Sequence, residues 1–242
     1  MKDILLESAL IPWSLFIDIE GFRVLFEDEE EKVLWFLNNF MKNIIDIGIK
    51  GYPDDGERLF IHQLGDGFII FPNIGDKDLL KPISIASVLM QLSAVNGGFL
   101  KAGISYGGHG DYSGCYPLEN CEKNGNVIRL GSGLMTYMPV LGMGLIRAYQ
   151  ISECAIGPIL IIDRKLTGFL EFNQFESRCY KNHIEINWLK ISTHVFNDLV
   201  EKLSIELPTP ESIKAKLKDY ITSYPELSDL WKKAAENVIL SY

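Results

Sequence analysis

The chain has 242 residues, of which 47% are apolar, and its net charge is −9. Its length and apolar share suffice for one packed domain with additions. The negative charge argues against a protein that wraps duplex nucleic acid, although it permits a small phosphorylated ligand. Glu7 and Pro12 interrupt the N-terminal apolar run, which is too short for a membrane span and lacks signal-peptide features. We therefore expect a cytoplasmic protein with free thiols and neither a membrane nor a nucleic-acid partner.

Strand and helix patterns alternate over the first two-thirds of the chain. "SLFIDI", from Ser14, predicts a first strand, and the apolar spacing over 21–49 predicts a helix. Two β-rich runs over 58–72 flank Gly65–Asp66–Gly67, which is typical of a hairpin. The later predicted elements are a helix over 78–98, a strand over 100–108, a helix that begins near Gly142 and a strand over 157–163.

This order of elements predicts an α+β fold class. It matches a ferredoxin-like βαββαβ core, with helices on one face of a mostly antiparallel sheet. The segments 169–175 and 183–191 are expected to pair as an added hairpin. The composition changes after Leu207, where two amphipathic helices separated by Pro225 are predicted. We therefore divide the chain into a domain over 1–206 and a C-terminal helical extension over 207–242.

Two carboxylates lie at two predicted turns. Asp18 ends the first strand and Asp66 lies in the Gly-Asp-Gly turn, and these elements are neighbours in a ferredoxin-like sheet. Two close carboxylates repel each other unless a positive charge lies between them. Divalent ions would supply that charge and create a two-metal site for phosphoryl chemistry. Either aspartate alone has a simpler explanation as a solvated strand end, so the pair carries the prediction.

The backbone around these turns also suits phosphate binding. Gly65 and Gly67 permit a tight turn and a close approach of a phosphate chain. The next helix is expected to begin directly after the first strand, so that its first N–H groups face the phosphates. The residues expected to contribute these groups are Ile19, Glu20, Gly21 and Phe22.

Five segments carry a resemblance to a known family. They are "FIDIEGF", "HQLGDGFIIF", "LKAGISYG", "LGMGLIRAYQISE" and "GPILIID", and their order is that of the catalytic domain of class III nucleotidyl cyclases. The chain resembles that family from Leu15 to Asp163. The resemblance implies that Asp18 and Asp66, assisted by the carbonyl of Ile19, hold two Mn²⁺ or Mg²⁺ ions per site. It also implies a homodimer with active sites between the subunits.

The chain departs from the purine cyclases at several positions. His62 stands four residues before the second aspartate, where adenylate cyclases have Lys, and Pro139 occupies their second base-reading position. Ile146 and Gln150 align with the Asn and Arg that steady the ribose and the transition-state charge. Arg147 lies next to them and is our candidate for the missing cation.

In these departures the chain is similar to the pyrimidine cyclases of bacterial anti-phage (antiviral) defence, the Pycsar systems. The similarity implies a lyase that converts UTP or CTP to the 3′,5′-cyclic monophosphate and pyrophosphate. A bulky Phe60 or His62 beside the base would favour one ring over two. A uridylate cyclase that makes cyclic UMP is favoured, because His62 can donate to a uracil carbonyl.

Two other functions stay open at this point. An inactive cyclase-like domain that binds a nucleotide or a partner protein would explain the altered Asn and Arg positions. The two acidic turns at Asp18 and Asp66 count against it, because an inert domain has no electrostatic reason to keep adjacent carboxylates. A diguanylate-synthase-like polymerase would share the core, but the chain lacks a GGDEF-type turn.

Overall fold

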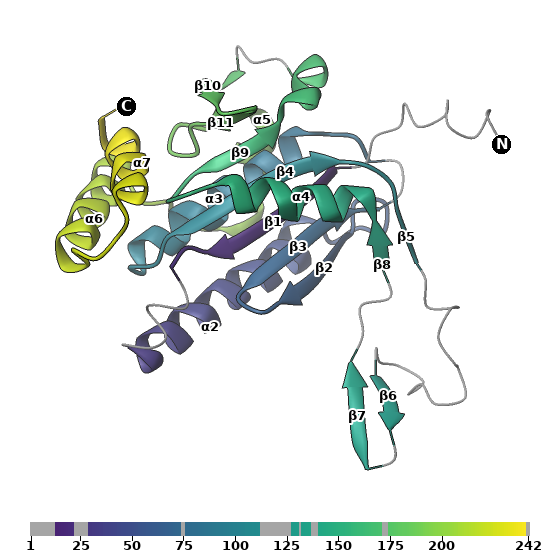
Figure 1. Cartoon of the computed structure of the whole chain (residues 1–242). Coiled ribbons are helices and arrows are strands. Elements are labelled where there is room, and N and C mark those ends of the chain that lie inside the picture. The colour runs from purple at the N-terminus through teal and green to yellow at the C-terminus, as the bar shows by residue number, and fades with distance from the viewer. Residues whose placement is uncertain are drawn as a thin grey trace.

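The computed structural model describes residues 13–21, 29–73, 76–111, 127–130, 132–136, 140–170 and 174–240. Within these ranges the chain forms a seven-stranded sheet in the order β10-β11-β9-β4-β1-β3-β2 (Figure 1). Its strands are β1 Trp13–Ile19, β2 Leu59–Leu64, β3 Gly67–Pro72, β4 Leu100–Tyr106, β9 Leu160–Asp163, β10 Ser177–Tyr180 and β11 His183–Ile186. Short strands β5 (His109–Asp111) and β8 (Val140–Gly142) form one small sheet, and β6 (Val127–Leu130) and β7 (Gly133–Thr136) form another. The α-helices are α2 Glu30–Asp46, α3 Leu80–Val95, α4 Met143–Cys154, α5 His194–Leu203, α6 Pro210–Ser223 and α7 Asp229–Leu240.

The strand order confirms the predicted α+β class and the ferredoxin-like core. Strands β4, β1, β3 and β2 are antiparallel neighbours, which is the order produced by a βαββαβ chain. Strand β9 adds to this core parallel to β4, after the crossover through α4. The β10–β11 hairpin then extends the sheet beyond β9.

The helices cover both faces of the sheet, so the expectation of a single covered face is wrong. Side chains alternate along β1, so Leu15 and Ile17 join the core under α2 and α3 while Phe16 faces the other side. Helix α4 covers that other side, and Figure 1 shows it crossing the near face of the sheet. Gly103 permits this approach, because a Cβ there would lie 2.6 Å from the backbone nitrogen of Ser152.

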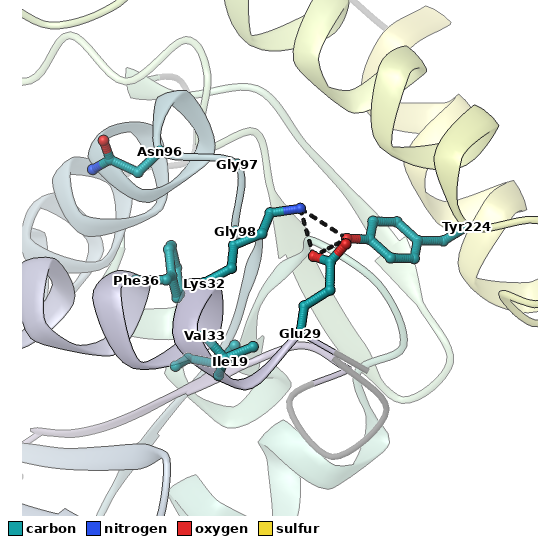
Figure 2. Close-up of a pocket in the computed structure, with 9 residues that line it drawn as sticks. All are labelled: Ile19, Glu29, Lys32, Val33, Phe36, Asn96, Gly97, Gly98 and Tyr224. Atoms are coloured by element: carbon teal, nitrogen blue, oxygen red, sulfur yellow. Dashed lines mark hydrogen bonds and ion pairs between the residues drawn. The ribbon is translucent and has the colours of Figure 1, made fainter. Parts of the chain in front are cut away.

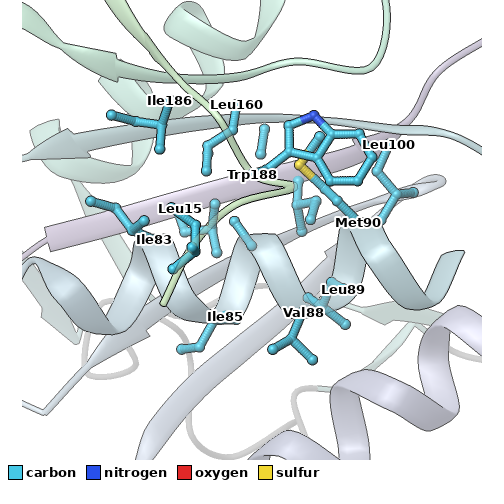
Figure 3. Packing of buried hydrophobic residues seen from close by; sticks show 14 of the residues in the cluster. Leu15, Ile83, Ile85, Val88, Leu89, Met90, Leu100, Leu160, Ile186 and Trp188 are labelled. Atoms are coloured by element: carbon cyan, nitrogen blue, oxygen red, sulfur yellow. The ribbon is translucent and has the colours of Figure 1, made fainter. Parts of the chain in front are cut away.

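The main core lies on the α2 and α3 side of the sheet. Helix α3 is apolar around most of its circumference, which indicates burial on several sides. Figure 3 shows Ile83 and Met90 of this helix on the side of the sheet and Trp188, and Ile85, Val88 and Leu89 on its other side. The Trp188 indole N–H donates to the Pro158 carbonyl at 2.8 Å. The buried apolar residues of α3 include Ile83, Ile85, Val88, Leu89 and Met90.

Two predicted elements differ from the structure in their bounds. The predicted helix over 21–49 is described only from Glu30, and it continues past Asp46 through a π-helical turn, η3 (Ile47–Gly51). The added hairpin exists, but its first strand is β10, and the described residues of 169–175 contain no strand. Lys181 has φ +52°, and this left-handed conformation makes the tight turn that fixes the register of β10 with β11.

The C-terminal segment forms two helices on either side of Pro225, as predicted. Thr209 caps α6 through its hydroxyl, which accepts a hydrogen bond from the Ser212 N–H at 3.2 Å. The buried side chains of α6 and α7, except Ala234, join the main hydrophobic cluster of the sheet. No helix in the described ranges combines the length and the apolar character needed to cross a membrane.

Candidate active site

The β2–β3 hairpin brings Asp66 to the end of β1. Leu64 pairs with Gly67, which leaves Gly65 and Asp66 as a two-residue turn, and Gly65 has φ +65°. A Cβ on Gly67 would lie 2.6 Å from Cζ of Phe16 and 3.2 Å from Oδ1 of Asp18. Glycine therefore suits both positions, Gly65 for the left-handed turn and Gly67 for the close approach to β1.

The structure places Asp18 and Asp66 close enough to interact strongly. Burial, and then the negative charge of Asp66, raise the pKa of Asp18 to about 7, while Lys101 acts in the opposite direction. Oδ1 of Asp18 is buried and has no hydrogen-bond partner within the described part of the chain. A buried anionic oxygen without a donor, next to a second carboxylate, fits a divalent cation.

The protein ligands of such an ion would be few. In the described ranges no group of three or more His, Cys, Asp or Glu side chains comes together as a metal site. Mg²⁺ in phosphate-binding enzymes is commonly held by one or two carboxylates together with substrate phosphates. The pair of Asp18 and Asp66 suits that kind of site, in which the substrate completes the coordination.

The main chain at the end of β1 agrees only in part with the expectation for phosphate binding. The N–H of Glu20 donates to the Phe99 carbonyl at 2.8 Å, so it is already used in the sheet. Because peptide groups alternate in direction along a strand, those of Ile19 face the side of the hairpin that carries Asp66. Gly21 follows with φ +78°, and Phe22 lies outside the described residues. Glu20 and Gly21 form a turn, and residues 22–28, over which the expected helix would start, lie outside the described residues.

Lys101 is a site residue that sequence reasoning missed. It lies opposite Asp18 in the β1–β4 register, and its Nζ is 3.7 Å from Oδ2 of Asp18. The same Nζ is 3.7 Å from Oε2 of Glu20 and 3.7 Å from Oε1 of Glu153, on α4. Alternation along the strand "LKAGISY" contained the signal, since it places a charged residue on the face that Asp18 shares.

Phe60 and His62 lie on the α4 face of the sheet, in an aromatic group around Phe71. The ring of Phe60 stacks on Phe71 with a centroid distance of 5.5 Å, and His62 stacks on Phe71 at 5.9 Å. His109, from β5, contacts the same ring at 4.6 Å. Burial lowers the pKa of both histidines, so each imidazole is neutral at pH 7 and carries one donor and one acceptor.

Arg147 lies at the opposite end of β1 from the carboxylates. Its guanidinium donates to the Tyr106 carbonyl at 3.3 Å and lies 4.9 Å from the centroid of the Tyr106 ring. Tyr106 pairs with Trp13, which is five positions before Asp18, or about 16 Å along an extended strand. The structure therefore does not bring Arg147 to Asp18 within one chain. Pro139, the expected second base-reading position, lies outside the described residues.

The C-terminal segment contacts the end of β1 and the start of α2, which sequence reasoning also missed. The Tyr224 hydroxyl donates to Oε2 of Glu29 at 2.9 Å and accepts from Nζ of Lys32 at 3.0 Å (Figure 2). These three side chains border a small pocket that also includes Ile19. A second pocket, of about 190 Å³, lies between the Glu20–Gly21 turn and the C-terminal helices. Both ends of the β1–α2 connection therefore contact the C-terminal segment.

No protein-family model and no curated protein matches the chain. Among solved structures, it is similar to the dimeric guanylyl cyclase domain of the RhoGC fusion protein from the aquatic fungus Blastocladiella emersonii. That match has 11% identity and a TM-score of 0.45, and covers 73% of this chain and 93% of that one. The catalytic core of a rhodopsin-guanylyl cyclase with converted specificity, in complex with ATPαS, matches with 9% identity, a TM-score of 0.45 and coverage of 73% and 94%.

A class III adenylyl cyclase-like ATP-binding protein from Pseudomonas aeruginosa matches with 14% identity and a TM-score of 0.46, over 80% of this chain and 40% of that one. The structural neighbours are thus class III nucleotidyl cyclase domains. With identities this low and TM-scores below 0.5, these similarities assign neither a substrate nor a residue role to the chain.

Proposed function

We propose that this protein is a homodimeric, metal-dependent nucleotide cyclase that acts on a pyrimidine nucleoside triphosphate. UTP is the favoured substrate and CTP the second. The observation that carries this proposal is the pairing of Asp18 with Asp66, which leaves a buried carboxylate oxygen without a donor. The cyclic nucleotide would be a cytoplasmic second messenger in anti-phage defence, a role suggested by the resemblance of the sequence motifs.

In the proposed reaction the ribose 3′-oxygen bonds to the α-phosphorus. The bond from that phosphorus to the bridging oxygen breaks, pyrophosphate leaves, and the hydroxyl proton passes to solvent. Two bound Mn²⁺ or Mg²⁺ ions would acidify the 3′-hydroxyl and offset the charge of the pyrophosphate. Asp18, Asp66 and the carbonyl of Ile19 are the proposed metal ligands. Gly21 and Phe22 are the proposed phosphate contacts, whereas the N–H of Glu20, which was expected to join them, already donates to the Phe99 carbonyl.

The separation of Arg147 from Asp18 supports a composite site built by two copies of the chain. A cation that stabilises the reacting phosphates must reach them, and Arg147 faces the other end of the sheet. Helix α4 and β8 also leave large apolar side chains open to solvent, which is unusual for a surface without a partner. These side chains, each about half exposed, are Leu141, Met143, Ile146 and Tyr149.

The aromatic group beside the hairpin supports a pyrimidine over a purine. Phe60 and His62 lie on β2, four and two positions before the strand ends at the Asp66 turn, and a neutral His62 can donate to a uracil carbonyl. A purine edge buried without partners costs about 1–3 kcal/mol per polar group. We expect ATP and GTP to react at least roughly tenfold more slowly than UTP for this reason.

The test is incubation of the purified chain with all four nucleoside triphosphates at equal concentration and Mn²⁺, followed by mass analysis of the products. The proposal expects cyclic UMP as the main product, with cyclic CMP next. Dominant cyclic AMP or cyclic GMP would overturn the pyrimidine assignment and keep the cyclase chemistry. Binding of a nucleotide without any cyclic product would instead favour the inactive, cyclase-like binding module, for which the exposed Ile146 is the supporting observation.

A mixing experiment tests the composite site. Asp66→Ala and Arg147→Ala chains are each expected to be inactive alone. After subunit exchange at equal amounts, half of the dimers are mixed and each has one intact site, so about a quarter of the wild-type activity should return. Failure to recover any activity, with exchange verified, would contradict the assignment of Arg147 to the partner's site.

A further inference from the structure

Lys101 is the cation nearest to the paired carboxylates in the described structure, and it contacts three acidic side chains at once. Its Nζ is 3.7 Å from a carboxylate oxygen of each of Asp18, Glu20 and Glu153. These distances exceed those of charge-assisted hydrogen bonds, so the contact is mainly electrostatic. The side chain is only 16% exposed, so water screens these interactions weakly.

The two oxygens of Asp18 have different surroundings. Oδ2 faces Lys101, whereas Oδ1 is buried near Gly67 and has no donor in the described part of the chain. A carboxylate fixed through one oxygen presents the other in a defined direction. That direction is toward the hairpin turn that carries Asp66.

Glu20 holds Lys101 in this position. Its Oε2 faces Nζ of Lys101, and the side chain is only 13% exposed. Lys101 is therefore held between two largely buried carboxylates, those of Asp18 and Glu20. Glu153 adds a third carboxylate, from α4, which is half exposed and interacts more weakly.

We propose that Lys101 is the internal counter-ion of the carboxylate pair. It is a positioning residue that orients Asp18 through Oδ2 and keeps divalent-metal affinity low until a nucleotide triphosphate is bound. This inference rests on the proposed function. Lys101 offsets part of the negative charge that attracts a cation, and the triphosphate then supplies the missing charge and oxygen ligands. Metal uptake thereby becomes coupled to the arrival of the substrate.

The proposal predicts opposite effects for two neutralising substitutions. Lys101→Met removes the competing positive charge, so the nucleotide-free protein should bind Mn²⁺ about tenfold more tightly or better. Glu20→Gln leaves Lys101 drawn more strongly to Asp18, so Mn²⁺ binding should weaken. Lys101→Arg keeps the charge and should return the affinity toward that of the wild type. If Lys101 had only a structural role, the Lys101→Met and Glu20→Gln variants would not change the Mn²⁺ affinity in opposite directions.

The experiment measures free Mn²⁺ by electron paramagnetic resonance in titrations of the full chain at pH 8. The part of the binding that Asp66→Ala removes defines the site. Lys81→Met is the matched control, because Lys81 is 12% exposed and pairs with Asp76 at 2.7 Å and Glu57 at 3.0 Å, away from the site. It should leave Mn²⁺ affinity unchanged.

If Lys101→Met does not fold, Lys101→Met combined with Glu20→Gln removes one charge of each sign and keeps the side-chain volumes close. That double variant should bind Mn²⁺ more tightly than Glu20→Gln alone. Unchanged or weaker binding by the Lys101→Met chain, or the absence of any Asp66-dependent Mn²⁺ binding in both it and the wild type, would overturn the proposal. Mn²⁺ binding is measured without turnover. The four-nucleotide assay can therefore give no cyclic product while the Mn²⁺ affinities still change in the expected directions, so the two proposals are tested separately.

Discussion

The two faces of the central sheet have different chemistry. The face under α2 and α3 is a continuous apolar layer, shown in part in Figure 3, in which Leu15, Ile17 and Leu89 are fully buried. The face under α4 has a small apolar cluster around Phe16, and next to it lie Asp18 and Lys101. Successive side chains of β1 point alternately to these two faces. Adjacent residues of β1 therefore belong either to the apolar core or to the candidate site, so mutations can change folding stability and activity separately.

The largest effect is expected at Asp66. Asp66→Ala should reduce cyclisation by about a thousandfold or more, because it removes a proposed metal ligand and the electrostatic stabilisation that depends on it. The melting temperature should change little, since the side chain lies in a turn and contributes little packing. Asp163→Ala is the matched control: this carboxylate also ends a strand, but it accepts from the Lys165 N–H at 2.9 Å and is assigned no role in the site. Near-wild-type activity of Asp66→Ala would remove the basis for separating the two faces.

The opposite pattern is expected at Leu89, a buried residue of α3. Leu89→Ala should lower the free energy of unfolding by about 2–5 kcal/mol, because it leaves a cavity in a fully buried layer. Turnover per folded molecule should be preserved. Chemical denaturation and kcat, measured on the same samples, check both parts, with Ile49→Ala at a 66% exposed position as the control. A large loss of kcat would show that the two faces are coupled.

Much of this arrangement follows from local sequence patterns. The strand that ends at Asp18, the Gly-Asp-Gly turn and the order of elements predict the ferredoxin-like core, because periodicity and turn chemistry are local properties. The side of the sheet that α4 covers was not predicted, since it depends on Gly103, whose missing Cβ lets the helix approach. The position of the late hairpin was missed for a similar reason, because the turn at Lys181 fixes its register rather than the apolar pattern.

Only the two aspartates of the candidate site could be predicted from the sequence. Asp18 and Asp66 stand out because carboxylates at two turns of neighbouring strands must be reconciled electrostatically. The contact of Tyr224 with Lys32 joins residues 192 positions apart, and no local pattern encodes such a pairing. Lys101 lies between these cases, since strand alternation predicts its face but not the three carboxylates around it.

The pH dependence of stability should sharpen the comparison. Burial raises the pKa of Asp18 from 3.8 to about 7, so between these values the folded chain holds a proton that the unfolded chain has lost. The metal-free wild type should therefore lose stability as pH rises through this window, by about 4 kcal/mol at full titration. The Asp18→Asn variant lacks this titrating group and should lose less stability over the same pH range. Urea titrations in chelator at several pH values measure the difference, and parallel curves for the two proteins would contradict the assigned burial of the charge.

The smallest effect is expected where the C-terminal segment meets the end of β1 and the start of α2 (Figure 2). Tyr224→Phe removes a hydroxyl that bridges Glu29 and Lys32, and should cost about 0.5–1.5 kcal/mol of stability. The value stays low because Lys32 and Glu29 are 56% and 40% exposed, so their ion pair is screened. A double-mutant cycle with Lys32→Met should give a coupling energy below about 1 kcal/mol, with kcat unchanged. A coupling of several kcal/mol, or a change in kcat, would mean that this contact belongs to the catalytic face and transmits the position of the C-terminal helices to Asp18.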